Sequence, residues 1–291
     1  MSEFERRALL AAAGLGTVAT LSKAGPLNPP AGSVVSTGRT LDEVYNRIPT
    51  LPAAGSYDGR TPITTPGTIL NPGSYVLTTH LMMSGPVVTL GISASDVTID
   101  LNGFRVGNTG TTGVCIGLLG NVNNVTIRNG STIGAEAGVY ADSGLAIGVR
   151  LEDLRIHRPH LSGIVFNHQL SRDVLIRRCQ ISDVGVSTSA ADVSTVVVGI
   201  NYRGSACRIE ECTVQNLVNA TPGPQTIRGI WINTTAFGNM VSRCHLSNPF
   251  TVGGTGIMMN SGSAQSAIYR DNTVQAYTAG YSGGSNGGGN V

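Results

Sequence analysis

Apolar and polar residues alternate with a period of two in short segments along most of the chain from Val87 onward. Such alternation is typical of β-strands that bury one face. The segments recur in seven units of 25 to 36 residues, and most units open with glycine followed by an apolar residue. A repeat of this period predicts a solenoid in which each unit forms one coil. The units begin at Val87, Gly113, Gly138, Gly163, Gly199, Gly229 and Gly256.

Each unit holds three apolar segments. In one unit the first is the glycine-led run Gly163–Phe166, the second pairs Val174 with Ile176, and the third pairs Cys179 with Ile181. Between the second and third segments the inward phase slips by one residue, which reverses the face of the side chains. We therefore expect a bend in each coil. Strands this short are stable only when the coils stack.

Stacking in register predicts columns of matched side chains, with Ile164, Ile200 and Ile230 piled one above another. At the bend, the matched positions carry charges that alternate in sign between neighbouring coils. Coils lie about 4.8 Å apart, so opposite charges face each other. Exposed pairs each stabilise a protein by only about 0–1 kcal/mol, so we expect these pairs mainly to fix register. The two columns are Asp100, Arg128, Glu152, Arg177, Glu210, Ser242, Arg270 and Leu101, Asn129, Asp153, Arg178, Glu211, Arg243, Asp271.

The segment Val97–Phe104 reads VTIDLNGF, which is similar to the segment that opens many bacterial secreted β-helix proteins. With the glycine-led repeat, it makes residues 87–280 resemble the pectate-lyase-like superfamily. The resemblance implies an all-β fold, a right-handed parallel β-helix of about seven full coils with partial coils before them. It also implies that a sugar polymer would lie on the outer face of the glycine-led sheet.

Composition narrows the class of protein. The 291 residues include 39 glycines, only 12% are charged, and the net charge is +2. This fits one turn-rich β-solenoid domain and not a disordered chain. There is no basic run, so nucleic acid is not an expected partner. We expect no cofactor.

Cysteines occupy one inward position in three successive coils, at Cys179, Cys212 and Cys244. We expect a stack of buried thiols that pack as small apolar groups, with disulfides between coils as the alternative. No metal site is expected, because three sulfurs on one line do not surround an ion. Cys115 is predicted to face outward as a free thiol.

The N-terminus resembles a twin-arginine export signal over residues 1–24. Arg6 and Arg7 precede the apolar run 8–21, and small residues precede a cleavage point after Ala24. This predicts a secreted, periplasmic or cell-surface protein. The alternative is a retained helix that packs on the protein or on a partner. The run is too short for a stable membrane span.

The remaining boundaries follow from composition. Residues 25–60 form a linker and an amphipathic helix, predicted at 40–48, that caps the solenoid. The β-helix is predicted over residues 61–280. Residues 281–291 are glycine-rich and predict a flexible tail. Because an open end is a liability, we expect this tail to fold back over the last coil or a second subunit to cover it.

Signals for catalysis are weak, and whether the protein is an enzyme stays open. A polysaccharide lyase needs a base and positive charge, for which Arg203 and Arg228 are candidates, although arginine is protonated at neutral pH. A glycoside hydrolase needs two carboxylates, and Asp142 is the one expected beside the sugar path. The run Arg155–His160 is locally basic. It is interpreted as a solvated loop, with binding of an anionic sugar or a metal as the alternative.

The outward column of the glycine-led strands is predicted to be apolar, which favours an interface. Its one tryptophan, Trp231, can stack on a sugar or anchor a protein contact. Three functions remain open: a non-catalytic structural protein that self-associates, a carbohydrate-binding protein, and a lyase or hydrolase acting on an acidic polysaccharide. The candidate ligand or interface residues are Tyr140, Val165, Tyr202, Trp231, Asn233 and Met258.

Overall fold

The computed structural model describes residues 59–141, 144–185, 196–218, 226–234, 236–249, 253–260 and 267–291. The chain divides into two compact units, residues 1–51 and 52–291, and every described residue belongs to the second. The export-like segment, the linker and the predicted capping helix lie outside the described residues. In the part of the chain that is described there is no helix, and so none long and apolar enough to cross a membrane.

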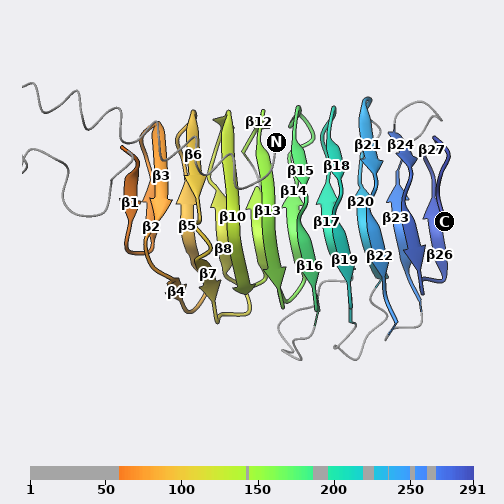
Figure 1. Cartoon of the computed structure of the whole chain (residues 1–291), viewed down its shortest axis with the longest axis horizontal. Coiled ribbons are helices and arrows are strands. Elements are labelled where there is room, and N and C mark those ends of the chain that lie inside the picture. The colour runs from red at the N-terminus through yellow and green to blue at the C-terminus, as the bar shows by residue number, and fades with distance from the viewer. Residues whose placement is uncertain are drawn as a thin grey trace, which may run out of the picture. The chain divides into compact units, whose positions relative to one another are not determined.

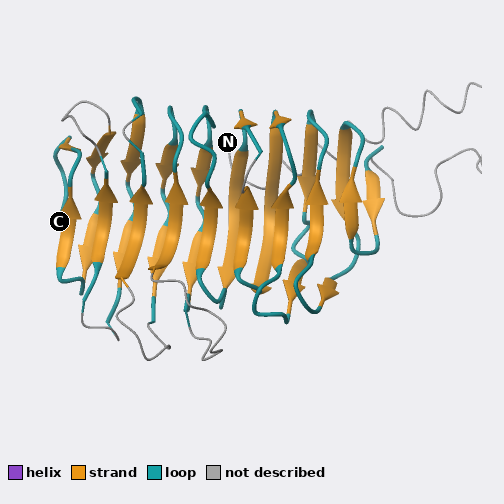
Figure 2. Ribbon diagram, turned by 180° about the vertical axis from the view of Figure 1, so that it is seen from behind, coloured by secondary structure: helices purple, strands orange, loops and turns teal. Residues whose placement is uncertain are grey.

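The described strands form a parallel β-helix (Figure 1), and each strand pairing among them is parallel. Successive coils follow one another along the stack, and the view from behind shows the same order (Figure 2). This confirms the predicted solenoid. Each complete coil has three legs, which correspond to the three apolar segments of the repeat.

The first leg is the glycine-led segment, and it builds a nine-stranded sheet. Neighbouring strands of this sheet come from successive coils, so the sheet runs the length of the stack. Its strands are β2 (Gly67–Ile69), β5 (Val88–Ile92), β8 (Val114–Leu118), β11 (Ala137–Ala141), β14 (Ser162–Phe166), β17 (Val196–Tyr202), β20 (Thr226–Ile232), β23 (Thr255–Met259) and β26 (Ala279–Ser282).

The second and third legs together make a sixteen-stranded sheet, since β10 and β13 pass through both legs without a break. The second leg comprises β1 (Thr61–Ile63), β3 (Gly73–Leu77), β6 (Val97–Asp100), β10 (Val125–Gly134), β13 (Arg150–His157), β15 (Leu175–Arg177), β18 (Arg208–Glu210), β21 (Asn239–Ser242), β24 (Ala267–Arg270) and β27 (Ser285–Asn286). The other strands of the third leg are β4 (Leu81–Met83), β7 (Arg105–Asn108), β16 (Gln180–Ser182), β19 (Thr213–Gln215), β22 (His245–Ser247) and β25 (Thr273–Gln275). Two short strands, β9 (Val122–Asn123) and β12 (Ala146–Ile147), pair with each other.

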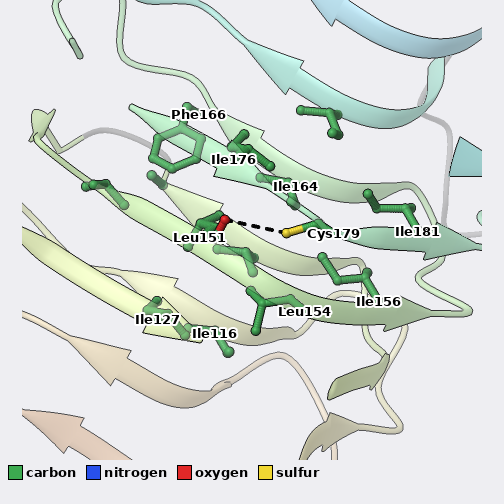
Figure 3. Close-up of a cluster of buried hydrophobic side chains, with 14 of the residues drawn as sticks. Ile116, Ile127, Leu151, Leu154, Ile156, Ile164, Phe166, Ile176, Cys179 and Ile181 are labelled. Carbon is green, nitrogen blue, oxygen red and sulfur yellow. Dashed lines mark hydrogen bonds between the residues drawn. The ribbon is translucent and has the colours of Figure 1, made fainter. Parts of the chain in front are cut away.

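The core is a set of stacked aliphatic columns. Ile164 is in register with Ile200, and Ile200 with Ile230, as predicted, and all three are fully buried. Burial of each such side chain stabilises the fold by about 1.5–3 kcal/mol. Figure 3 shows side chains of the three legs, among them Phe166 and Ile181, packed around this core.

The glycine that opens the first leg in five successive coils, from Gly138 to Gly256, is required by a close approach between legs. A Cβ atom on Gly199 would lie 2.5 Å from the Gly229 carbonyl oxygen and 2.5 Å from a methyl group of Val214 on the third leg. Even alanine would therefore push the two legs apart. The repeat opens on glycine because the third leg packs directly on this backbone.

The second unit departs from the predicted register. Ile116, not Val114, is in register with Val139, so the strand is shifted by two residues. Cys115 therefore occupies the glycine column, where it is buried and donates a weak hydrogen bond from Sγ to the Ile133 carbonyl at 3.4 Å. The prediction of an exposed thiol is wrong.

The bends carry the predicted charged columns, which we name the bend ladder and define by Glu152, Asp153, Arg177 and Arg178 with their equivalents in other coils. Arg177 donates to Glu152 at 2.8 Å, and Arg178 donates to Asp153 through two hydrogen bonds of 2.7 Å. Asp153 and Arg178 both have left-handed backbone, with φ of 55° and 52°. Hydrogen bonds from Arg178 lower the pKa of the Asp153 carboxyl.

The cysteine stack has free, buried thiols, as expected. Each Sγ points along the stack toward a backbone carbonyl near 3.6 Å, as Figure 3 shows for Cys179 and Leu151. These residues therefore pack as small apolar groups with weak donors.

The flexible tail predicted at residues 281–291 is wrong, and the alternative that the segment folds back is what the structure has. Strands β26 and β27 continue the two sheets. Val291 donates to Asn272 and accepts from Val274, both at 2.8 Å. Gly283 and Gly284 supply the positive φ of the turn between the strands, which explains why a glycine-rich segment can close a partial coil.

Candidate functional site

The outward side chains of the nine-stranded sheet form the face on which the sequence places a ligand, named here the Trp231 face. Its central column runs through Gly91, Gly117, Tyr140, Val165, Asn201, Trp231 and Met258. Arg228 is the one charged residue within these nine strands as described. Those strands contain no carboxylate.

Three residues at the centre of this face form what we name the Trp231 cluster: Asn201, Arg228 and Trp231. Asn201 on β17 is in register with Trp231 on β20. The guanidinium carbon of Arg228 lies 3.5 Å from the centroid of the Trp231 ring, which is a cation–π contact. Strict alternation would put Arg228 and Trp231 on opposite faces, but the alternation breaks at Gly229 and both side chains face outward.

The cluster holds four buried polar atoms that have no hydrogen-bond partner in the described part of the chain. They are Asn201 Oδ1, Arg228 Nε and Nη1, and Trp231 Nε1. A buried donor without an acceptor costs about 1–3 kcal/mol, and more when the group is charged. Burial also lowers the pKa of the Arg228 guanidinium. The cluster therefore has three unmet donor atoms and one unmet acceptor atom on two neighbouring strands.

Asparagines flank the cluster at the ends of the strands. Asn260 donates from Nδ2 to Asn233 Oδ1 at 3.0 Å. Arg203 follows β17 in the same outward column as Asn233. In its own coil it lies five residues beyond Val198, the register partner of Arg228, and so about 16 Å along the strand. The two arginines therefore do not converge on one reacting group.

Other candidates are placed differently. Tyr202 is fully buried inside the coil. Its hydroxyl donates to the backbone carbonyl oxygen of Ser171 (3.0 Å) or of Ser205 (2.9 Å). Its predicted place in a ligand groove is therefore wrong. Val165 faces outward but is only 4% exposed. Tyr140 is half-buried and Asn167 donates to its hydroxyl at 3.4 Å. Asp142 lies outside the described residues.

The outward column is also less apolar than predicted. The shifted second unit puts Gly117 where Cys115 was expected, and Asn201 interrupts the aliphatic residues further along. Self-association through an apolar stripe stays a prediction, without a continuous exposed stripe to support it. Across the described ranges, no group of three or more His, Cys, Asp or Glu residues is arranged to hold a metal ion.

Comparisons with known proteins are sparse. No family model matches the chain, and no curated protein does so. Among solved structures, the crystal structure of pectate lyase Pel9A is similar with a TM-score of 0.47 and 12% sequence identity, over 77% of this chain and 67% of that one. The fold assignment itself rests on the parallel pairing of the coils.

The sequence pointed to Trp231 but missed its partner. From sequence, Arg228 is a candidate only for lyase chemistry, because strict alternation places Arg228 and Trp231, three residues apart, on opposite faces of the strand. The signal that would have joined them is Gly229 between them, since glycine recurs at that position from Gly138 to Gly256 and marks the break in alternation.

Proposed function

We propose that this protein is a non-catalytic, exported β-helix protein that binds an acidic polysaccharide along the Trp231 face. The observation that carries the proposal is the set of unpartnered buried atoms in the Trp231 cluster. A buried guanidinium is stable when it is paired with an anion. A uronate carboxylate supplies that anion, and it would offer oxygen acceptors to Arg228 and to the Trp231 N–H group once these side chains turn outward, because their unpartnered nitrogens are closed to solvent in the free protein.

The remaining groups suit a sugar. Asn201 Oδ1 is an acceptor for a hydroxyl group, and Asn233 and Asn260 extend amides along the neighbouring column. Sites built from planar and amide side chains in this way hold a sugar by several directed hydrogen bonds. Binding is favoured over catalysis because the described strands of this face carry no carboxylate, and because arginine is a poor base.

Calorimetry with polygalacturonate as the acidic polymer and dextran as the neutral one tests the proposal. We expect polygalacturonate to bind and dextran not to bind. Arg228→Gln should weaken binding roughly 30-fold or more, the effect typical of removing one partner of a buried charge pair. Arg208→Gln is the matched control, since Arg208 is exposed on another leg, and it should leave binding unchanged.

Three results contradict the proposal. The first is equal binding of the two polymers, and the second is an Arg228→Gln variant that binds polygalacturonate as the parent does. The third is release of an unsaturated product that absorbs in the near ultraviolet, which would make the protein a lyase instead.

A further inference from the structure

A concave surface separate from the Trp231 face runs over the outside of the third legs, on the sixteen-stranded sheet. We name it the polar groove and define it by Arg105, Ser131, Arg155, His157, Gln180 and Thr213. It consists of three adjoining depressions of about 650, 380 and 400 Å³. The first shares Arg155 and His157 with the second, and Arg105 with the third, so the three are continuous.

The groove follows the axis of the stack. Arg105, Ser131, Arg155, Gln180 and Thr213 are successive members of one register column, from β7 through β10, β13 and β16 to β19. Four steps of about 4.8 Å give a length of about 19 Å. A linear polymer lying along the axis would therefore meet one side chain of this column in every coil.

Two arginines of the groove have no side-chain partner in the described part of the chain. Within the described residues, the side chains of Arg105 and Arg155 make no hydrogen bond or ion pair, and both are exposed. They stand two coils apart with Ser131 between them, which keeps the like charges from direct contact. Arg158 adds a third positive charge at one end.

The carboxylates nearby already have hydrogen-bond or ion-pair partners within the fold. Both oxygens of Asp153 accept from Arg178 at 2.7 Å. Asp183 accepts from Asn216 and lies 3.1 Å from His157. The groove therefore presents net positive charge, and its ligand should be an anion.

The other lining groups identify the class of anion. Ser131, Gln180, Thr213 and their neighbours Ser182 and Gln215 are hydroxyl and amide side chains that both donate and accept. Among the described residues, no Phe, Tyr or Trp lines the depressions, so these residues do not supply the stacking surfaces that single-stranded nucleic acids require. Alternating cations and hydroxyl-binding groups match a polymer in which carboxylates alternate with hydroxyls.

We infer that the polar groove is a second binding site for an acidic polysaccharide, separate from the Trp231 face. The inference rests on the proposed function only for the class of ligand. The arginines would receive carboxylates, and the hydroxyl and amide groups would bind the sugar hydroxyls between them. The run Arg155–His160, interpreted from sequence as a solvated loop, contributes Arg155 and His157 to this site.

The two sites can be measured separately because the chain has one tryptophan. Tryptophan fluorescence reports binding at the Trp231 face alone, and calorimetry reports both sites. The probe is oligogalacturonate, and the variants are Arg105→Gln/Arg155→Gln and, as a control with the same loss of charge, Arg150→Gln/Arg208→Gln. Both pairs are exposed, and an unchanged Tm shows that each variant is folded.

We expect the fluorescence titration of the groove variant to match that of the parent. In calorimetry the variant should lose one binding phase, because the affinity of the polar groove falls at least about tenfold. In an Arg228→Gln background the remaining binding should disappear when the groove is changed, and should persist in the control. Added salt should weaken this remaining binding.

The inference is overturned if Arg105→Gln/Arg155→Gln binds oligogalacturonate like the parent in both backgrounds. It is equally overturned if the control pair weakens binding as much, because the effect would then be one of net charge. Loss of the fluorescence change in the groove variant would show a single shared site. Groove binding without any effect of Arg228→Gln would support this inference and contradict the proposed function, so the two failures are distinguishable.

Discussion

Arginine residues occur in two contrasting settings in this β-helix. In the bend ladder, Arg177 and Arg178 each donate to a carboxylate of the preceding coil at 2.8 and 2.7 Å. In the Trp231 cluster, Arg228 lies against an aromatic ring, and two of its buried nitrogens have no acceptor in the described chain. Charges that are paired within the fold serve the fold. Arg177 also has one buried nitrogen without a partner, Nε, but its guanidinium is paired with Glu152, whereas half-buried Arg228 has no carboxylate partner in the described chain and is available to a ligand.

The largest expected difference is that replacing the arginine should change stability in opposite directions in the two settings. Arg228→Met should raise the stability of the free protein by about 1 kcal/mol, because it removes an unpaired buried charge and keeps apolar contact with Trp231. Arg177→Met should lower it by about 1–2 kcal/mol, because Glu152, whose side chain is 15% exposed, loses its partner. Urea unfolding monitored by circular dichroism measures both. A destabilised Arg228→Met variant would break the comparison.

The next largest difference is expected in the dependence of stability on acid pH, which should involve the bend ladder and not the Trp231 cluster. Burial alone would raise the pKa of Asp100, but hydrogen bonds from Asn102, Asn129 and Arg60 outweigh it, and the pKa is lowered. The pKa of Asp153 is also lowered. A lowered carboxyl pKa stabilises the fold above the unfolded value of about 3.8, and this contribution is lost as the pH falls below it.

We therefore expect Tm to fall below pH 4 by roughly 2–4 °C per kcal/mol lost. The parent and Arg228→Met should fall alike, since the cluster has no carboxylate among its residues. Arg178→Gln should fall less, because its Asp153 no longer has a lowered pKa to lose. Identical acid sensitivity of all three proteins would show that the ladder does not govern this transition.

The smallest effect concerns the more exposed column of the ladder, to which Asp153 and Arg178 belong. Exchanging the charges of one pair, in Asp153→Arg/Arg178→Asp, should restore most of the stability lost in each single variant. The coupling energy should be about 0.2–1 kcal/mol, because the pair is exposed to solvent. A double-mutant cycle in urea measures it, and addition of 1 M salt should reduce it. A coupling of zero would leave the ladder only its role in register.

The fold was predictable because the same sequence pattern recurs in each coil of a solenoid. Ile164, Ile200 and Ile230 occupy equivalent places in successive units, so each unit tests the alignment of the others. The second unit was misaligned by two residues because Cys115 replaces the glycine that marks the register elsewhere. The bend ladder was likewise found from its alternating charges, although its first coil has a bend two residues longer.

The candidate site was predictable only in part. Trp231 was found because its outward position follows from the repeat. Its contact with Arg228 depends on a local break in alternation, and the missing hydrogen bonds are a property of packing that no residue pattern records. The polar groove was overlooked because Arg105 and Arg155 are fifty residues apart. They share one column only when the coils are stacked.

The glycine column described above also determines how this architecture can change size. From Gly138 to Gly256 the third leg packs on that backbone in five successive coils, so the first and third legs keep the same close spacing through this part of the stack. A compact globule that gains residues must thicken its interior, whereas this molecule lengthens by about 4.8 Å for each coil added. Equivalent side chains along any ligand path on its sides are therefore spaced at equal intervals.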